Sequence, residues 1–144
     1  MNLCRLIYVS KAVSPIDPKS INDIADVSAR RNAEMGVTGI LLATKTHYLQ
    51  VLEGEVEAVN QIYCNVVGDP RHTDVILIAY QKIAELQFKE WAMRGTSTGL
   101  MGRILATNLK NKYGEDHGDL NIPLDEHLAY ALLYDVYAFF KENR

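Results

Sequence analysis

Residues 35–55, MGVTGILLATKTHYLQVLEGE, contain the pattern from which the fold follows. Two apolar runs, 37–43 and 48–52, flank the polar segment 44–47, and this arrangement predicts a β-hairpin. Gln50 lies inside the second apolar run. A buried amide without partners costs about 1–3 kcal/mol for each unpaired group. Gln50 therefore either faces water at a sheet edge or has specific hydrogen-bond partners.

The composition is that of an ordinary soluble domain. The chain has 144 residues, 48% of them hydrophobic and 23% charged, enough for one domain with a terminal extension. A net charge of −3 without any basic block argues against direct binding to nucleic acid or a membrane surface. No apolar run approaches the ~18 residues of a membrane span, and MNLCRLIYVS lacks signal-peptide features, so we expect a cytoplasmic protein. Cys4 and Cys64 are expected to be buried free thiols.

The segments around the hairpin have clear periodicities. The expected elements are a strand over 3–10, a helix over 20–35, the two hairpin strands, a helix over 55–67, and strands over 75–79 and 87–93. Ser20 and Asp23 fit a capping box at the start of the first helix. The all-apolar strand 75–79 predicts burial on both faces. Alternation in the last strand places Trp91 and Met93 on one face.

The order βαββαββ predicts an α+β fold with a ferredoxin-like sheet and one additional strand. Because strand–helix–strand crossovers are right-handed, both helices should lie on the same face of the sheet. Two further helices are expected over 101–113 and 124–142, the second of them too apolar to be left in water. We therefore expect a domain over 1–96 and a helical extension over 97–144, which either covers the open face or forms an oligomer contact.

Several polar residues are expected to converge on one site. Ser28 and Asn32 interrupt the apolar stripe of the first helix, and Asn32 taken alone is best explained as a cap of its C-terminal end. In this fold the first and third strands are adjacent, so Tyr8 and Gln50 become neighbours beneath Asn32. The expected apolar walls of this pocket are Ile7, Ile24, Leu41 and Leu52. No nucleophile–base pair, carboxylate dyad or metal set is present, which is typical of a site that binds a flat heteroaromatic molecule.

The sequence resembles the BLUF family of flavin-binding blue-light sensors, in its short stand-alone form with two C-terminal helices. The matching motifs are RLIYVS at 5–10, RRN at 30–32, GVTGILL at 36–42, YLQVLEGE at 48–55, DPRH at 69–72 and F-x-x-W-x-M at 88–93. The resemblance implies FAD as the cofactor. It implies that Tyr8 donates an electron to the photoexcited flavin, with Gln50 between Tyr8 and the ring. Asn32 would bind the other edge of the ring, and Ser28 would lie near it.

Further roles follow from the same resemblance. Arg71 and His72 would approach the ribityl–phosphate tail of the cofactor. Trp91 and Met93 match the tryptophan and methionine of the family, for which it is debated which of the two is buried and which is exposed. Many short members have Asn-Asn where this chain has Arg31 followed by Asn32. Arg31 therefore either reaches the phosphate or faces solvent.

The implied function is blue-light sensing without enzymatic activity. Light would rearrange the hydrogen bonds of Tyr8, Gln50 and the flavin, and the change would pass to a response protein, with a homo-oligomer also expected. The residues alone leave open two alternative functions. One is a regulatory domain that binds a small metabolite, and the other is an acylphosphatase-like hydrolase that binds phosphate through Arg31 and Asn32. The second lacks a glycine-rich phosphate loop near its first strand.

Overall fold

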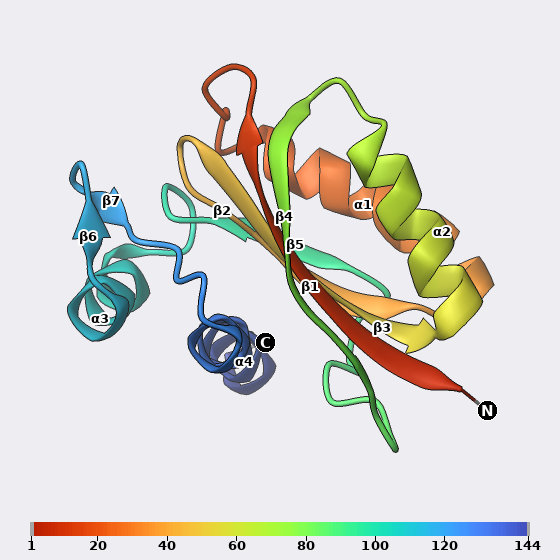
Figure 1. Cartoon of the computed structure of the whole chain (residues 1–144). Coiled ribbons are helices and arrows are strands. Elements are labelled where there is room, and N and C mark those ends of the chain that lie inside the picture. Colours follow the sequence, from red (N-terminus) through yellow and green to blue (C-terminus); the bar gives the residue numbers. More distant parts are fainter. Residues whose placement is uncertain (1, 144) are drawn as a thin grey trace.

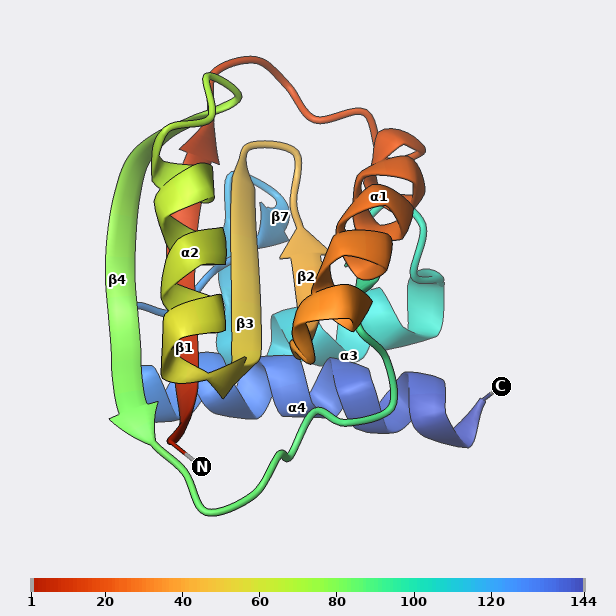
Figure 2. The same ribbon diagram turned by 90° about the vertical axis from the view of Figure 1, so that its right-hand side faces the viewer.

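A five-stranded sheet with helices on both faces forms the body of the molecule (Figures 1 and 2). The structure, a computed structural model, describes residues 2–143. The strand order is β4-β1-β3-β2-β5, which confirms the ferredoxin-like α+β fold with an additional strand. The elements are β1 (Leu3–Ala12), α1 (Ser20–Met35), β2 (Thr38–Ala43), β3 (His47–Glu55), α2 (Val56–Val67), β4 (His72–Lys82), β5 (Arg94–Ser97), α3 (Arg103–Tyr113), β6 (Glu115–Asp116), β7 (Asp119–Leu120) and α4 (Glu126–Glu142).

The predicted hairpin forms the middle of the sheet. β3 lies between β1 and β2 and is antiparallel to both, so Gln50 is directly opposite Tyr8 on one side and Leu41 on the other. Directly paired residues point to the same face of a sheet. Tyr8, Leu41 and Gln50 therefore all face α1 and α2, which cover this side as predicted (Figure 2). Gln50 does not lie at a sheet edge.

The opposite face of the sheet is covered by α4. Asp125 caps this helix by accepting hydrogen bonds from the backbone amides of His127 and Leu128. The buried stripe of α4 packs against a second apolar core that includes Ile7, and the helix contacts β1, β2, β3 and β4. The stripe consists of Ala129, Leu132, Leu133, Val136 and Tyr137. The sheet thus separates two cores, one towards α1 and α2 and one towards α4 (Figure 1).

The predicted strand over 87–93 is wrong. Those residues form an irregular segment, and the fifth strand is β5, which pairs in parallel with β2. The backbone amides of Gln87 and Phe88 donate to the buried carboxylate of Glu53, at 2.7 Å each, and so are not available to a strand ladder. Without strand alternation, Trp91 and Met93 point into different cores, and the prediction that they share a face is also wrong.

Three local predictions are also overturned. β4 is an edge strand and is largely exposed, because only β1 pairs with it and the expected burial on both faces does not occur. Ser20 is the first residue of α1, and no side chain caps that end, since the Ser20 hydroxyl donates to the carbonyl of Asp17. Both cysteines are free as expected, but Cys64 is exposed on α2.

Candidate functional site

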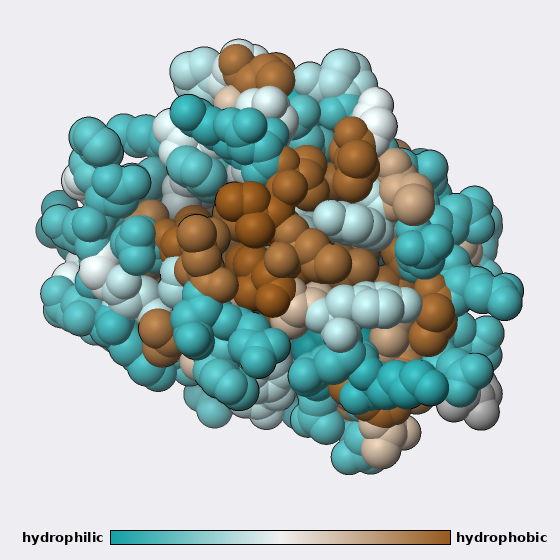
Figure 3. Space-filling model, in the orientation of Figure 1, coloured by the Kyte–Doolittle hydropathy of each residue, from teal (hydrophilic) through white to brown (hydrophobic). Residues whose placement is uncertain are grey.

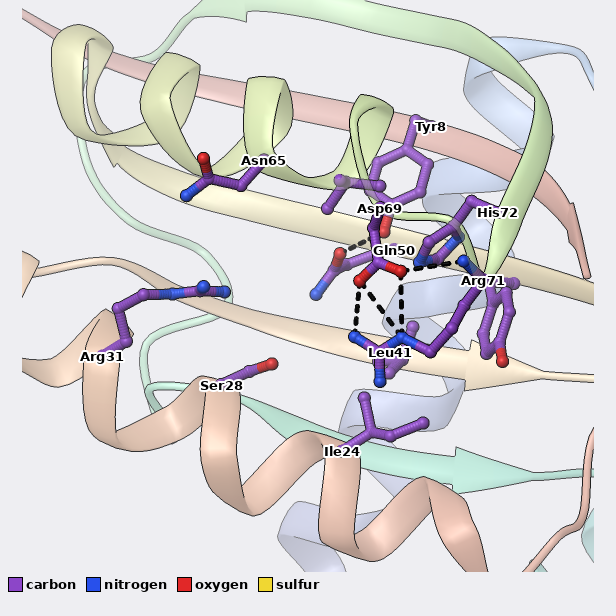
Figure 4. A pocket seen from close by; sticks show the side chains of 12 residues that line it. Tyr8, Ile24, Ser28, Arg31, Leu41, Gln50, Asn65, Asp69, Arg71 and His72 are labelled. Carbon is purple, nitrogen blue, oxygen red and sulfur yellow. Dashed lines mark hydrogen bonds and ion pairs between the residues drawn. The ribbon is translucent and has the colours of Figure 1, made fainter.

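A pocket opens between α1, α2 and the face of the sheet that carries Tyr8 and Gln50, which we call the pocket side (Figure 4). Ile24, Ser28 and Arg31 project from α1 on one side, Asn65 comes from α2 on the other, and Gln50 lies between them. The full lining is Tyr8, Ile24, Ser28, Arg31, Leu41, Tyr48, Gln50, Asn65, Val66, Asp69, Arg71 and His72. Most of the residues that the sequence selected therefore meet at one place.

Tyr8 and Gln50 are joined by a short hydrogen bond. The phenol of Tyr8 donates to Oε1 of Gln50 at 2.5 Å, and the Tyr8 side chain is 1% exposed. Burial raises the pKa of Tyr8 far above its ordinary value, and the nearby Tyr48 and Asp69 raise it further. Tyr8 is therefore a neutral phenol over the whole physiological range. The cross-strand register brings the two side chains together, as the sequence predicts.

The other end of the Gln50 amide has a weaker partner. Nε2 of Gln50 donates to the sulfur of Met93 at 3.3 Å. A thioether is a weak acceptor, so this bond is easily exchanged for a better one. Of the pair Trp91 and Met93, it is Met93 that contacts Gln50. Trp91 lies in the α4 core, where its ring centroid is 5.6 Å from that of Tyr137.

Asn32 is fully buried on α1 but lies outside the residues that line the pocket. Its Nδ2 donates to the carbonyl of Ala92 at 3.2 Å, next to Met93 in the chain. Its Oδ1 has no partner among the residues that the structure describes. The side chain does not cap α1, which ends at Gly36 with a left-handed backbone, so the capping interpretation is wrong. A buried acceptor left unpaired costs about 1–3 kcal/mol, which favours a ligand group beside it.

Charged groups gather where β4 begins (Figure 4). The guanidinium of Arg71 binds the carboxylate of Asp69 through Nε and Nη2, the shortest contact being 2.6 Å. This hydrogen bond lowers the pKa of Asp69 to about 2. Burial lowers the pKa of His72, whose Nδ1 is 2.6 Å from Oγ of Ser10. This side of the pocket therefore offers the Arg71 cation beside a neutral imidazole.

Two of the four apolar residues predicted to line the pocket do so. Ile24 and Leu41 line the pocket, whereas Ile7 points into the α4 core and Leu52 lies deeper in the pocket-side core. The lining residues that were missed are Tyr48, Asn65, Val66 and Asp69. Opposite charges two residues apart in DPRH could have indicated the ion pair with Arg71. Nothing in the local pattern of α2 marks Asn65.

Residues 3–94 match the family described as "Sensors of blue-light using FAD", BLUF. The photoactivated adenylate cyclase subunit beta of Euglena gracilis is 35% identical over 105 residues, which are 73% of this chain and 12% of that protein. The blue light- and temperature-regulated antirepressor BluF of Escherichia coli (strain K12) is 39% identical over 74 residues, 51% of this chain and 18% of that protein. The chain thus spans about an eighth of the length of the cyclase relatives that it matches.

Solved structures support the same relationship. The dark-state structure of the BLUF protein BlrB has a TM-score of 0.74 at 29% identity, covering 95% of this chain and 96% of that one. The ground state of BlsA has a TM-score of 0.74 at 21% identity, covering 94% and 87%, and shows the shared fold alone.

A family match over most of the chain settles its class. The chain belongs to the BLUF family, the sensors of blue light that use FAD. The site fits such a cofactor, because it combines amide donors and acceptors, a buried phenol and the unpaired Oδ1 of Asn32. The metabolite-binding and hydrolase alternatives are not favoured. Among residues 2–143, no helix is both long and apolar enough to cross a membrane.

Proposed function

We propose that this protein is a blue-light sensor that signals through a hydrogen-bond switch of Tyr8 and Gln50. The proposal rests on one observation. Oε1 of Gln50 accepts from the Tyr8 phenol while Nε2 of the same amide donates to Met93. Bound FAD supplies the absorption of blue light and an excited state that accepts an electron. Asn32 and Gln50 would hold the ring, with Ser28 beside it.

Arg71, His72 and Arg31 would hold the phosphate end of the cofactor. The first two lie at the start of β4, and Arg31 lines the opposite side of the pocket (Figure 4). The Arg71 side chain is 58% exposed, so it can turn from Asp69 to a phosphate at small cost. The contacts to a dinucleotide would thus be divided between α1 and the start of β4.

Within this proposal, Tyr8 is the electron donor and Gln50 carries its proton. Once the electron and the proton had returned to Tyr8, it would again be a neutral phenol, and the Gln50 amide would have rotated or tautomerised. An amide suits this role because it is both donor and acceptor and can exchange its two ends. In the switched state Gln50 would offer a stronger hydrogen bond to the ring, which would lower the excited state more than the ground state. The expected signature is a small red shift of the flavin absorbance.

The signal would leave the pocket through residues 83–93. Met93 in this segment contacts Gln50, whereas Phe88 and Trp91 pack on aromatic residues of α4. We propose that 1–96 is the light-sensing domain and 97–144 the output extension, acting in the cytoplasm without catalytic activity. The output would be a changed contact with a response protein or with another copy of the chain.

The decisive experiment compares the single variants Tyr8→Phe and Gln50→Leu with the matched control Tyr63→Phe. The Tyr63 ring is 5.8 Å from that of Tyr8 but has no part in the Tyr8–Gln50 bond. We expect all three proteins to retain flavin, and only the control to form the red-shifted state under blue light. A normal photocycle in Tyr8→Phe or Gln50→Leu would overturn the proposal, as would a wild-type protein that takes up no FAD.

A further inference from the structure

A second cleft lies where α3, β6 and β7 meet the end of the sheet. It has a volume of about 310 Å³ and is lined by Pro18, the turn 44–45, the loop 97–99, Lys110 and the turn 117–119. β6 and β7 lie beside the end of the sheet at which β2 and β5 finish (Figure 1). This part of the surface is mainly hydrophilic in Figure 3, unlike the apolar area near the middle of that view. We call this space the extension cleft.

Hydrogen bonds within the chain hold the walls of the extension cleft in place. The carbonyl of Ser97 accepts from the backbone amide of Met101 at 2.9 Å, which fixes the loop after β5. On the other side, the backbone amide of Lys45 donates to Oδ2 of Asp119 at 3.0 Å. This bond connects the turn between β2 and β3 with the start of β7. The cleft is therefore a preformed feature of the fold, as ligand sites usually are.

The hydroxyl of Ser97 is a buried polar group without a partner at this cleft. Ser97 is 1% exposed, and its Oγ forms no hydrogen bond within residues 2–143. A Cβ placed on Gly99 would lie 3.9 Å from this oxygen and 2.9 Å from Cγ of Pro18, so the hydroxyl is close to two other residues that line the cleft. Buried hydroxyls in folded proteins are nearly always paired. The unpaired Oγ therefore favours a ligand group that reaches it.

The charged side chains of the extension cleft favour an anion. Nζ of Lys110 donates to the carbonyl of Gly118 at 3.1 Å, which leaves two of the three donors of this ammonium group. Neither Lys110 nor Lys45 forms an ion pair within residues 2–143. Both oxygens of the Asp119 carboxylate already accept from backbone amides, those of Lys45 and Leu120. Two lysines against one engaged carboxylate leave the cleft positive, in a chain whose net charge is −3.

We propose that the extension cleft binds a phosphate group. Phosphate combines several acceptor oxygens with a charge of about −1.5 to −2 at neutral pH, which suits one hydroxyl and two ammonium groups. The group belongs either to inorganic phosphate or to a small phosphorylated metabolite, since the cleft has room for more than the phosphate itself. None of the residues that line this cleft lines the pocket of Tyr8 and Gln50, so the two sites are separate. The inference does not rest on the light-driven switch.

The test is isothermal titration calorimetry of the flavin-loaded full chain with inorganic phosphate. We expect one phosphate to bind per chain, with half-saturation below about 10 mM. Acetate at the same ionic strength should show no saturable binding, because it has fewer oxygens and a smaller charge. Ribose 5-phosphate distinguishes the two sources of the group. Tighter binding than that of inorganic phosphate identifies a phosphorylated metabolite, and equal or weaker binding identifies the free anion.

Three single variants locate the bound phosphate. Lys110→Gln removes one ammonium group and should weaken binding at least about tenfold. Ser97→Ala should weaken binding about three- to tenfold without lowering the thermal midpoint, because the hydroxyl it removes is unpaired in the free protein. Lys112→Gln is the matched control, since the Lys112 ammonium pairs with Asp135 outside the cleft, and it should bind phosphate as the wild type does.

The flavin absorbance of each variant shows that it has folded. Phosphate should also raise the thermal midpoint of the wild type and of Lys112→Gln, and raise that of Lys110→Gln less, because a ligand of the folded state stabilises it. A wild type without saturable phosphate binding, acetate binding as tight as that of phosphate, or undiminished affinity in Lys110→Gln or Ser97→Ala would overturn the proposal.

Discussion

At the scale of single residues, the two ends of the Gln50 amide have unequal partners. Its oxygen accepts from a buried phenol at 2.5 Å, whereas its nitrogen donates to the Met93 sulfur at 3.3 Å. A neutral hydrogen bond contributes about 0.5–1.5 kcal/mol, and one to a thioether contributes less. This inequality leaves the nitrogen end free to exchange its partner at small cost, which a reversible switch requires.

Met93→Leu tests this inequality. Leucine is close to methionine in volume, so the fold should lose less than about 1.5 kcal/mol. The dark arrangement loses the acceptor of Gln50 Nε2, whereas an arrangement in which that nitrogen has turned away loses nothing. Destabilising the dark arrangement by about 0.5–1 kcal/mol should slow the return from the red-shifted state about two- to fivefold. Absorbance decay after illumination measures this rate, and an unchanged or faster return would contradict the assignment.

His72 gives the stability a dependence on pH. Burial lowers the pKa of its imidazole in the folded chain, so the unfolded chain binds this proton more tightly. The contribution of neutral His72 is therefore complete above the unfolded pKa of about 6.5 and is lost as the pH falls towards the lower folded pKa. Urea unfolding between about pH 8 and pH 5 should show the free energy of unfolding declining below about pH 6.5. His72→Gln should make that decline shallower, and an equal decline in both proteins would exclude His72 as its cause.

The residue-level prediction succeeded where register alone determines contact. Tyr8 and Gln50 face each other because antiparallel pairing and alternation leave no other arrangement. Taken alone, Asn32 was interpreted as a helix cap because its sequence position allows one, but tertiary packing turns its side chain towards Ala92. Arg71 and His72 at the start of β4 were predicted and line the pocket, whereas Asn65 and Val66 of α2 could not be predicted, since their approach depends on how α2 sits on the sheet.

At the scale of elements, one buried carboxylate holds the segment between β4 and β5. Glu53 is 0% exposed, and its Oε2 accepts from Nε of Arg5 at 2.8 Å. Its Oε1 accepts from the amides of Gln87 and Phe88. The guanidinium of Arg5 also lies 4.6 Å from the ring centroid of Tyr130 on α4. The carboxylate thus connects β3, the irregular segment and, through Arg5, the C-terminal helix.

Two substitutions separate the functions of this carboxylate. Glu53→Gln keeps an oxygen for the two backbone amides but leaves the Arg5 charge unpaired, which should lower the free energy of unfolding by about 3 kcal/mol. Glu53→Leu also leaves both amides without an acceptor and should cost about 1–3 kcal/mol more. Denaturant unfolding of the two variants gives both values. Equal losses would show that the amide contacts contribute nothing.

This carboxylate also explains the main failure of the element prediction. The apolar alternation around Trp91 and Met93 is typical of a strand, but the sequence does not show that Glu53 occupies the amides a ladder would need. The four helices and β1 to β4 were located from their apolar periodicity, whereas β5 and the two-residue strands β6 and β7 were not predicted. β4 was expected to be buried, since an apolar run of that kind does not distinguish a central strand from an unprotected edge.

At the scale of the whole molecule, one sheet separates two cores that differ in their side chains. The pocket-side core contains polar groups such as Tyr8 and borders Gln50, whereas the core under α4 is apolar and aromatic. Leu133 is 0% exposed in the α4 core. α4 contacts β1, β2, β3 and β4 of the main sheet, so this helix packs as part of the folded body.

Leu133→Ala should therefore destabilise the entire chain. Removing a fully buried leucine side chain costs about 2–5 kcal/mol, and the loss should appear equally in flavin release and in unfolding of the sheet. Ile104→Ala provides the comparison, because Ile104 is 77% exposed and should change the stability by less than about 0.5 kcal/mol. Thermal unfolding followed by circular dichroism and by flavin absorbance measures both. A variant that keeps full stability would show that α4 is not integral to the fold.

The position of Trp91 gives the molecule a native optical reporter. It is the only tryptophan in the chain, and its indole lies against Tyr137 of α4 with the Arg94 guanidinium 5.0 Å from the ring centroid. Indole fluorescence responds to the polarity and charge around the ring. The wavelength and intensity of its emission therefore report on the contact between residues 83–93 and α4. Light-induced motion at that junction can thus be followed in the unlabelled protein, separately from the absorbance that reports on the pocket.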